Sequence, residues 1–194
     1  QLDNLGSCHA ALMALLGTDA NAPKASAVCF LFDHEEVGST SAKGADGSFL
    51  DDVLERIGLC CGLGREDYRR ALSRSMLVSA DMAHAFHPGH AGAYDDQHRV
   101  HLNHGPVIKT NASQRYTSES LSAGVFQLAC ERAGVPWQSY VQRSDLACGS
   151  TIGPLAASRL GLRSVDVGNP MWAMHSLRES AGAAVMEVSS HALH

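Results

Sequence analysis

Two adjacent glutamates, Glu35 and Glu36, follow shortly after an apolar run at residues 27–32. The run is typical of a buried strand, and the C-terminal edge of a sheet is where α/β proteins keep their active sites. Two neighbouring carboxylates repel each other and are costly to desolvate, and a bound cation removes both penalties. One glutamate could then bind a metal ion while the other handles a proton. An isolated Glu-Glu pair is more often a solvated acidic turn, so the rest of the chain must decide.

Acids or histidines recur at four junctions between predicted elements. Besides the glutamate pair these are Asp3, just before a predicted helix, Asp81 with His84, after a second apolar run at 76–80, and His175. Taken singly, Asp3 fits a helix N-cap, and a lone histidine before a helix is usually structural. Together they form a set rich in carboxylates, with histidine and without thiolate. Such a set suits a pair of divalent ions bridged by a carboxylate, in a hydrolase that activates water.

The composition bounds the class of protein. The 194 residues form one domain or a large part of one, and 45% hydrophobic with 18% charged residues is typical of a soluble globular protein. A net charge of −5, without a cluster of Lys or Arg, argues against a nucleic-acid partner. We expect no membrane partner and no signal peptide, because no apolar run is long enough to span a bilayer. The six cysteines include no CxxC pair, which favours free thiols and a cytoplasmic location.

Helical periodicity and strand-like runs alternate along the chain. This alternation predicts an α/β sandwich with a largely parallel sheet. The glycine-rich stretch 148–154 lacks the Gly-Lys-Ser/Thr of a nucleotide-binding loop and predicts a tight turn that opens a helix. We expect helices over about 5–16, 49–57, 67–75, 118–134, 154–161 and 176–188, and strands over 27–32, 76–80, 105–111, 137–141 and 162–167.

Seven segments closely resemble the M18 family of metallo-aminopeptidases, in its aspartyl aminopeptidase group. The resemblance covers nearly the whole chain in the right order. It implies a three-layer α/β/α catalytic domain of the zinc-exopeptidase type, into which the family inserts a separate, mostly β, dimerisation domain. Residues 1–194 would then be the C-terminal portion of the catalytic domain, lying after that insertion. The segments are Leu2-Asp3-Asn4-Leu5, Asp33-His34-Glu35-Glu36-Val37-Gly38-Ser39, Ser79-Ala80-Asp81-Met82-Ala83-His84-Ala85, Gly105-Pro106-Val107-Ile108-Lys109, Gln114-Arg115-Tyr116, Gly149-Ser150-Thr151-Ile152-Gly153-Pro154 and Ala173-Met174-His175-Ser176.

The resemblance also implies a role for each acid and histidine of the set. Asp3 would be the carboxylate that bridges two zinc ions. Asp81 would complete the first zinc site with a histidine from outside this chain, and Glu36 and His175 would complete the second. Glu35 matches the general base, which takes a proton from the attacking water and passes it to the leaving amine.

Three further residues match positions that contact substrate in the family. They are His84, Lys109 and Tyr116. Lys109 could pair with an acidic N-terminal side chain, and His84 could steady the developing oxyanion. The family commonly has a cis peptide after the bridging acid, here between Asp3 and Asn4. The sequence departs from the family at His104, which precedes Gly105, because relatives often carry lysine there.

The function implied is a two-zinc aminopeptidase that removes acidic residues from peptide N-termini. The resemblance implies peptide substrates, Zn²⁺ with Mn²⁺ or Co²⁺ as substitutes, and a homo-oligomer of the dodecameric kind. One alternative is a broad-specificity two-metal aminopeptidase of the same clan. Another is a metal-binding scaffold without catalysis, against which Glu35 argues, because a scaffold needs no general base.

Overall fold

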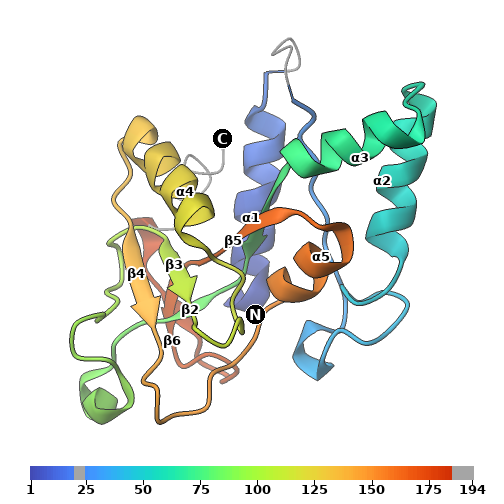
Figure 1. The fold of residues 1–194 in the computed structure, drawn as a ribbon. Coiled ribbons are helices and arrows are strands. Elements are labelled where there is room, and N and C mark those ends of the chain that lie inside the picture. The colour runs from blue at the N-terminus through green and yellow to red at the C-terminus, as the bar shows by residue number, and fades with distance from the viewer. Residues whose placement is uncertain (20–24, 185–194) are drawn as a thin grey trace.

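The computed structural model describes residues 1–19 and 25–184 (Figure 1). Its larger sheet has the strand order β1-β5-β3-β4. β1 and β5 are parallel, as are β3 and β4, but β3 runs antiparallel to β5. The sheet is therefore mixed, so the expectation of a largely parallel sheet is met only in part. The strands are β1 Met76–Ala80, β3 Val107–Thr110, β4 Gln138–Val141 and β5 Arg163–Gly168.

A smaller sheet extends the end of the larger one. β2 (Ala83–His84) and β6 (Pro170–Trp172) are parallel and follow β1 and β5 along the chain, and β7 (Ser180–Ala181) runs antiparallel to β6. The two sheets meet where Gly168 lies against the carbonyl of Asp81. A Cβ atom on Gly168 would lie 2.1 Å from the Asp81 carbonyl oxygen, so only glycine allows this approach.

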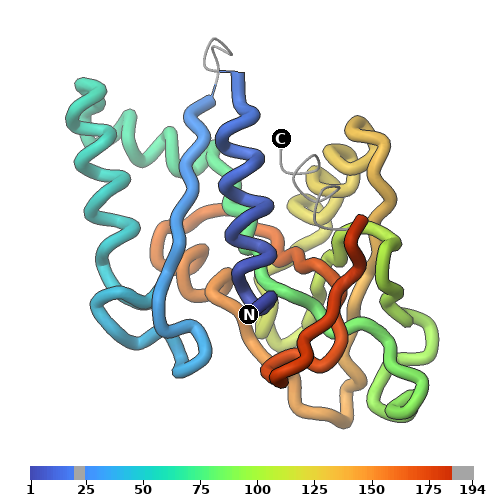
Figure 2. The backbone as a smooth tube through the Cα atoms, turned by 180° about the vertical axis from the view of Figure 1, so that it is seen from behind, coloured from blue at the N-terminus to red at the C-terminus, as the bar shows by residue number. Residues whose placement is uncertain are grey.

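Helices cover both faces of the larger sheet, as an α/β/α arrangement requires. On one face Phe126 of α4 packs with Val165 and Val167 of β5. Leu77 of β1 points to the other face, where it packs near Leu160 of α5, because side chains alternate along a strand. Figures 1 and 2, seen from opposite sides, place α1 and α5 on opposite faces of the strands. The helices are α1 Leu2–Gly17, α2 Phe49–Cys60, α3 Arg65–Arg74, α4 Ser120–Ala133 and α5 Gly153–Leu160, with short 3-10 helices η1 Glu35–Val37 and η2 Pro88–Ala93.

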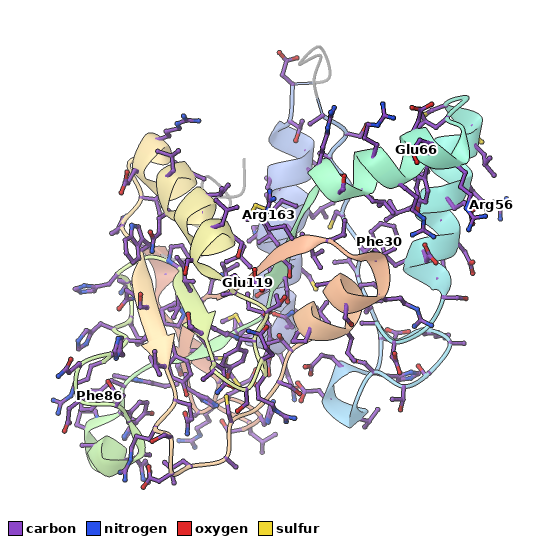
Figure 3. The ribbon with its side chains drawn as sticks, viewed as in Figure 1. Phe30, Arg56, Glu66, Phe86, Glu119 and Arg163 are labelled. Carbon is purple, nitrogen blue, oxygen red and sulfur yellow. The ribbon has the colours of Figure 1, made fainter. Side chains whose placement is uncertain are left out.

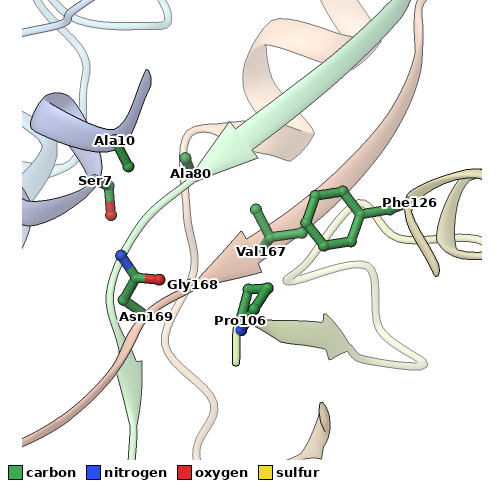
Figure 4. A pocket seen from close by; sticks show the side chains of 8 residues that line it. All are labelled: Ser7, Ala10, Ala80, Pro106, Phe126, Val167, Gly168 and Asn169. Atoms are coloured by element: carbon green, nitrogen blue, oxygen red, sulfur yellow. The ribbon is translucent and has the colours of Figure 1, made fainter. Parts of the chain in front are cut away.

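Small residues bring α1 close to the sheet. Ser7 and Ala10 of α1 face Phe126 of α4 and Val167 of β5 across a cavity of only about 10 Å³ (Figure 4). That is close to the smallest space that holds one water molecule. The packing fixes the N-terminal end of α1, which carries Asp3, beside the ends of the central strands.

α2 and α3 extend to one side of the sheet and carry many charged side chains, among them Arg56 and Glu66 (Figure 3). Most of the predicted elements are confirmed with shifts of a few residues at their ends, including β1 and the left-handed Gly134 that ends α4. Within residues 1–19 and 25–184, no helix is long and apolar enough to cross a membrane.

The predicted strand at 27–32 is wrong for the described structure. These residues are extended, run beside α1 (Figure 2), and have no strand partner in the part of the chain that is described. With the outer strand β1 they line an open groove of about 380 Å³. The groove separates the segment from β1, so the two backbones do not pair.

The predicted last helix at 176–188 is wrong over residues 176–182, and within its described part only Ala183 and Ala184 are helical. Ser180 and Ala181 form β7 instead, and the preceding Glu179 uses its carboxylate to accept backbone N–H groups. These contacts hold the segment in turns and a short strand. Residues 185–188 of the predicted helix lie outside the described residues.

Candidate active site

All eight residues singled out in the sequence line one pocket of about 130 Å³. They come from α1, η1, the end of β1, β2, β3, the loop after β3 and the turn after β6. The fold therefore brings together side chains from both ends of the chain, as the sequence predicts. The residues are Asp3, Glu35, Glu36, Asp81, His84, Lys109, Tyr116 and His175.

Asp3, Glu36 and His175 form a cluster with the character of a metal site. Nε2 of His175 lies 2.9 Å from Oδ2 of Asp3 and 3.1 Å from Oε2 of Glu36. One ligand atom from each residue falls within 4.8 Å of the others. Two carboxylate oxygens and one imidazole nitrogen are donors that zinc accepts.

Local structure fixes both ends of this cluster. The Asp3–Asn4 peptide is cis, as the family resemblance implies, and Nδ2 of Asn4 donates to the carbonyl of Ala80 at 2.9 Å. The carboxylate of Glu179 accepts the backbone N–H of Asp3 at 3.4 Å and that of His175 at 2.8 Å. One carboxylate thus ties the start of α1 to the turn after β6.

The glutamate pair forms the start of the 3-10 helix η1. Its first flank, His34, and its last, Gly38, both have left-handed backbone conformations, with φ values of 65° and 96°. Glu35 is half-buried in the pocket, whereas the side chain of Glu36 is 56% exposed and reaches His175. The two carboxylates therefore have different surroundings and can serve different purposes.

The carboxylates of the pocket are crowded. Burial, together with the charges of Asp81 and Glu36, raises the pKa of Asp3 to about 7, and the same causes raise the pKa of Glu35 to about 7. Within the described residues, Oδ1 of Asp3 is buried without a hydrogen-bond partner. Carboxylates accept hydrogen bonds and bind cations but donate nothing when ionised. The donor set therefore fits a divalent cation.

Asp81 lies in the same pocket but outside the three-residue cluster. Its Oδ2 accepts from Nζ of Lys109 at 3.2 Å, and its Oδ1 accepts the backbone N–H of Met82 at 2.8 Å. Nζ of Lys109 also donates to the carbonyl of Met82 at 2.6 Å. The lysine side chain is only 4% exposed, so it acts first as the charge partner of Asp81.

The substrate-contacting candidates line the same pocket as the cluster. Burial, with the nearby cations Lys109 and His175, lowers the pKa of His84 and favours its neutral imidazole. The ring of Tyr116 lies 5.5 Å from Nζ of Lys109 and packs edge-on against Tyr140. Burial holds the pKa of Tyr116 far above its usual range, so its hydroxyl stays protonated.

Comparison with known proteins identifies the family of the chain. The family described as "Aminopeptidase I zinc metalloprotease (M18)" matches residues 1–194. The chain belongs to the M18 family. A probable M18 family aminopeptidase 2 of Mycobacterium tuberculosis is 50% identical over 195 residues, which cover 100% of this chain and 45% of that protein. The chain therefore spans about half the length of this curated M18 relative.

Solved M18 structures share the fold. The chain of an Ape4–Nbr1 complex matches with a TM-score of 0.90 and 43% identity, covering 100% of this chain and 37% of that chain. An S. cerevisiae mApe1 dodecamer matches with a TM-score of 0.84 and 26% identity, covering 99% of this chain and 43% of that chain. The expected α/β fold is therefore that of M18 aminopeptidases, as a partial domain of the longer chains.

Two residues that support the site were not predicted from the sequence. Glu179 acts on backbone N–H groups that meet only in the folded chain. Asp166 interrupts the apolar strand Val165-Asp166-Val167 and is completely buried. An acid in the middle of an apolar strand was the available signal, because such a carboxylate needs internal donors.

Proposed function

We propose that residues 1–194 form the C-terminal portion of the catalytic domain of a two-zinc aminopeptidase that prefers acidic N-terminal residues. The observation that carries the proposal is the convergence of eight predicted site residues in one pocket, with Asp3, Glu36 and His175 within ligand distance of one another. The M18 membership of the chain supplies the chemical class, a zinc aminopeptidase.

The residues divide into two groups of metal donors. Asp3 has one oxygen beside His175 and Glu36 and a second, buried oxygen without a hydrogen-bond partner in the described part of the chain. We assign it as the bridging carboxylate. Glu36 and His175 would hold one zinc ion, and Asp81 would help to hold the other, together with a ligand from outside residues 1–194. Bound zinc would acidify a water molecule and polarise the scissile carbonyl.

Glu35 is the group that moves the proton. It takes a proton from the attacking water and gives it to the amine that leaves when the peptide bond breaks. A base of this kind works best with a pKa near the operating pH, and burial already holds the pKa of Glu35 well above that of a solvated glutamate. Its half-buried position in η1 keeps it in the pocket without a place in the metal-type cluster.

Lys109 supports the preference for acidic residues. A lysine ammonium has three hydrogen-bond donors, and Asp81 and Met82 receive two of them. The third N–H can donate to a substrate carboxylate, since Lys109 lines the pocket. His84, on the same wall, donates to the oxygen of the scissile carbonyl from its neutral imidazole.

The open groove beside β1 supports the assignment of a partial domain. β1 is the outer strand of the sheet, and the strand-like segment 27–32 faces it across the groove. A strand from the remainder of a longer polypeptide would pair with β1 and fill this space. We also propose a homo-oligomer, on the likeness to the mApe1 dodecamer.

A broad-specificity aminopeptidase is the second candidate. It is favoured by one observation, the engagement of Lys109 by Asp81 and Met82, which can be read as a purely internal charge pair. In that reading the pocket holds no cation for the substrate. The two candidates share the same metal donors and the same general base, and they differ only in what the pocket selects.

Substrate assays on the full-length protein distinguish them. We expect kcat/KM for aminoacyl-anilides of Asp and Glu to exceed that for Leu by at least about tenfold, the effect of one charge pair. An acetylated Asp-anilide should be inert, chelation should abolish hydrolysis, and Zn²⁺ should restore it. Equal rates on Asp and Leu would favour broad specificity, and hydrolysis that survives chelation would refute the metal-dependent reaction.

A further inference from the structure

A buried carboxylate lies behind the pocket. It is neither one of the proposed metal ligands nor the proposed general base. Asp166, in the middle of β5, is completely inaccessible to solvent. Its Oδ2 accepts the backbone N–H of Thr117 at 2.6 Å, and its Oδ1 accepts the hydroxyl of Thr151 at 2.7 Å. The backbone of β5 also binds the segment that contains Thr117, because the N–H of Asp166 donates to Oγ of Ser118 at 2.9 Å.

Both loops that Asp166 holds contribute to the wall of the pocket. Thr117 directly follows Tyr116, which lines the pocket, and residues 149–151 line the same pocket. These are separate segments, one after β3 and one before α5, and both are hydrogen-bonded to Asp166 of β5. One carboxylate therefore fixes the spacing between two parts of the wall.

The first residue of α5, Gly153, lies directly against this carboxylate. A Cβ atom at Gly153 would lie 2.6 and 2.7 Å from the two oxygens of Asp166. Glycine is required for so close an approach. This close packing fixes the first turn of α5 against β5. It thereby also fixes the position of residues 149–151, which come just before the helix.

We propose that Asp166 is a positioning residue that fixes the pocket wall formed by Tyr116 and residues 149–151, and so sets which substrate side chains the pocket accepts. The inference rests on the proposed aminopeptidase function and concerns the selectivity of the same site. Asp166 does not touch the substrate. It acts through the two hydrogen bonds to Thr117 and Thr151.

A purely structural role explains the observations less well. Burying a carboxylate costs more than burying an apolar side chain of similar volume, so stability alone does not favour Asp at this place. Its two side-chain acceptors both serve segments that lead into the pocket wall, and the hydrogen bonds to an ionised acceptor are short and directional. Such contacts fix geometry, which an apolar core position does not.

The test uses the full-length protein and a graded set of variants. Thr151→Val removes the hydroxyl donor with little change of shape, Thr151→Ser restores a donor, and Asp166→Ala removes both acceptors. Ser164→Ala is the matched control, because Ser164 is buried on the same strand and contacts the Thr117 hydroxyl without touching Asp166. The readouts are kcat and KM on Asp, Glu, Leu and Ala anilides, bound zinc, and the thermal midpoint.

We expect Thr151→Val and Asp166→Ala to change the ratio of kcat/KM between acidic and apolar substrates by about tenfold, mainly through KM, as for one lost buried hydrogen bond. Bound zinc should stay at the wild-type level, and Thr151→Ser should recover the wild-type ratio. Ser164→Ala should lower the thermal midpoint without changing the ratio.

Two results would overturn the inference. In one, Thr151→Val lowers the thermal midpoint but keeps the wild-type substrate ratio. In the other, Ser164→Ala shifts the ratio as much as Thr151→Val does. If Asp166→Ala does not fold, the Thr151 pair decides alone. A wild-type protein without aminopeptidase activity would instead refute the proposed function, which is a distinct outcome.

Discussion

The proposed preference for acidic substrates rests on one residue, Lys109. The side chain is nearly inaccessible, and Asp81 and the Met82 carbonyl hold its ammonium in place. From sequence the lysine could only be placed near the end of a strand, because its partners come from the connection between β1 and β2. The same limit applies to Asp166 and Glu179, whose partners are mostly backbone N–H groups that no motif records.

Lys109→Met tests the charge of the pocket. A partly desolvated charge pair with a substrate carboxylate contributes about 2–4 kcal/mol, so kcat/KM on Asp and Glu anilides should fall by about one to three decades. Leu anilides should lose at least about tenfold less, since only the Asp81 contact is then at stake. Equal losses on both classes would show that Lys109 serves Asp81 alone and that the pocket is not selective for acids.

At the scale of elements, periodicity located the helices but not the faces that they bury. α4 shows an apolar row at Leu121, Val125 and Leu128, yet these side chains are exposed while Phe126 and Cys130 pack on the sheet. α1 similarly buries Gly6, Ser7, Ala10 and Ala14. Small residues determine how closely a helix approaches a sheet. A search for large apolar residues at helical spacing does not detect them.

The junction of α1 with the turn after β6 depends on Glu179. Its Oε2 accepts the N–H of Leu2 at 2.8 Å, and its Oε1 accepts that of His175. Strand pairing alone would leave Asp3 and His175 free to drift apart, because they belong to elements that are not neighbours in a sheet. A side chain that keeps one of the two Glu179 oxygens should therefore preserve part of the contact that holds Asp3 near His175.

Glu179→Ala should weaken zinc binding to the full-length protein by about 10–100-fold, as is typical when a group that orients metal ligands is removed. Glu179→Gln keeps one acceptor oxygen and should fall between Ala and the wild type. Competition with a chromogenic chelator measures both. Wild-type affinity in Glu179→Ala would mean that α1 and the turn hold Asp3 and His175 without this link.

For the molecule as a whole, the alternation of helices and strands predicted an α/β fold, while the three-layer α/β/α arrangement and the candidate site residues were implied by the family resemblance. The unpaired segment 27–32 and the open edge of β1 were not, since the sequence of a strand does not say which neighbour it pairs with. The chain spans 45% of the length of an M18 relative.

The central claim is that Glu35 moves the proton while its neighbours hold zinc. The most direct measurement is kcat of Glu35→Gln in the full-length protein, together with its zinc content by mass spectrometry. Glu66→Gln is the control, because Glu66 is an exposed glutamate on α3, far from the pocket (Figure 3).

We predict that Glu35→Gln retains wild-type zinc and loses at least about a hundredfold in kcat, the usual contribution of a general base, while Glu66→Gln matches the wild type. A Glu35→Gln enzyme that keeps near wild-type turnover would contradict the account. So would a loss of zinc in proportion to the loss of activity, because Glu35 would then be a metal ligand rather than the base.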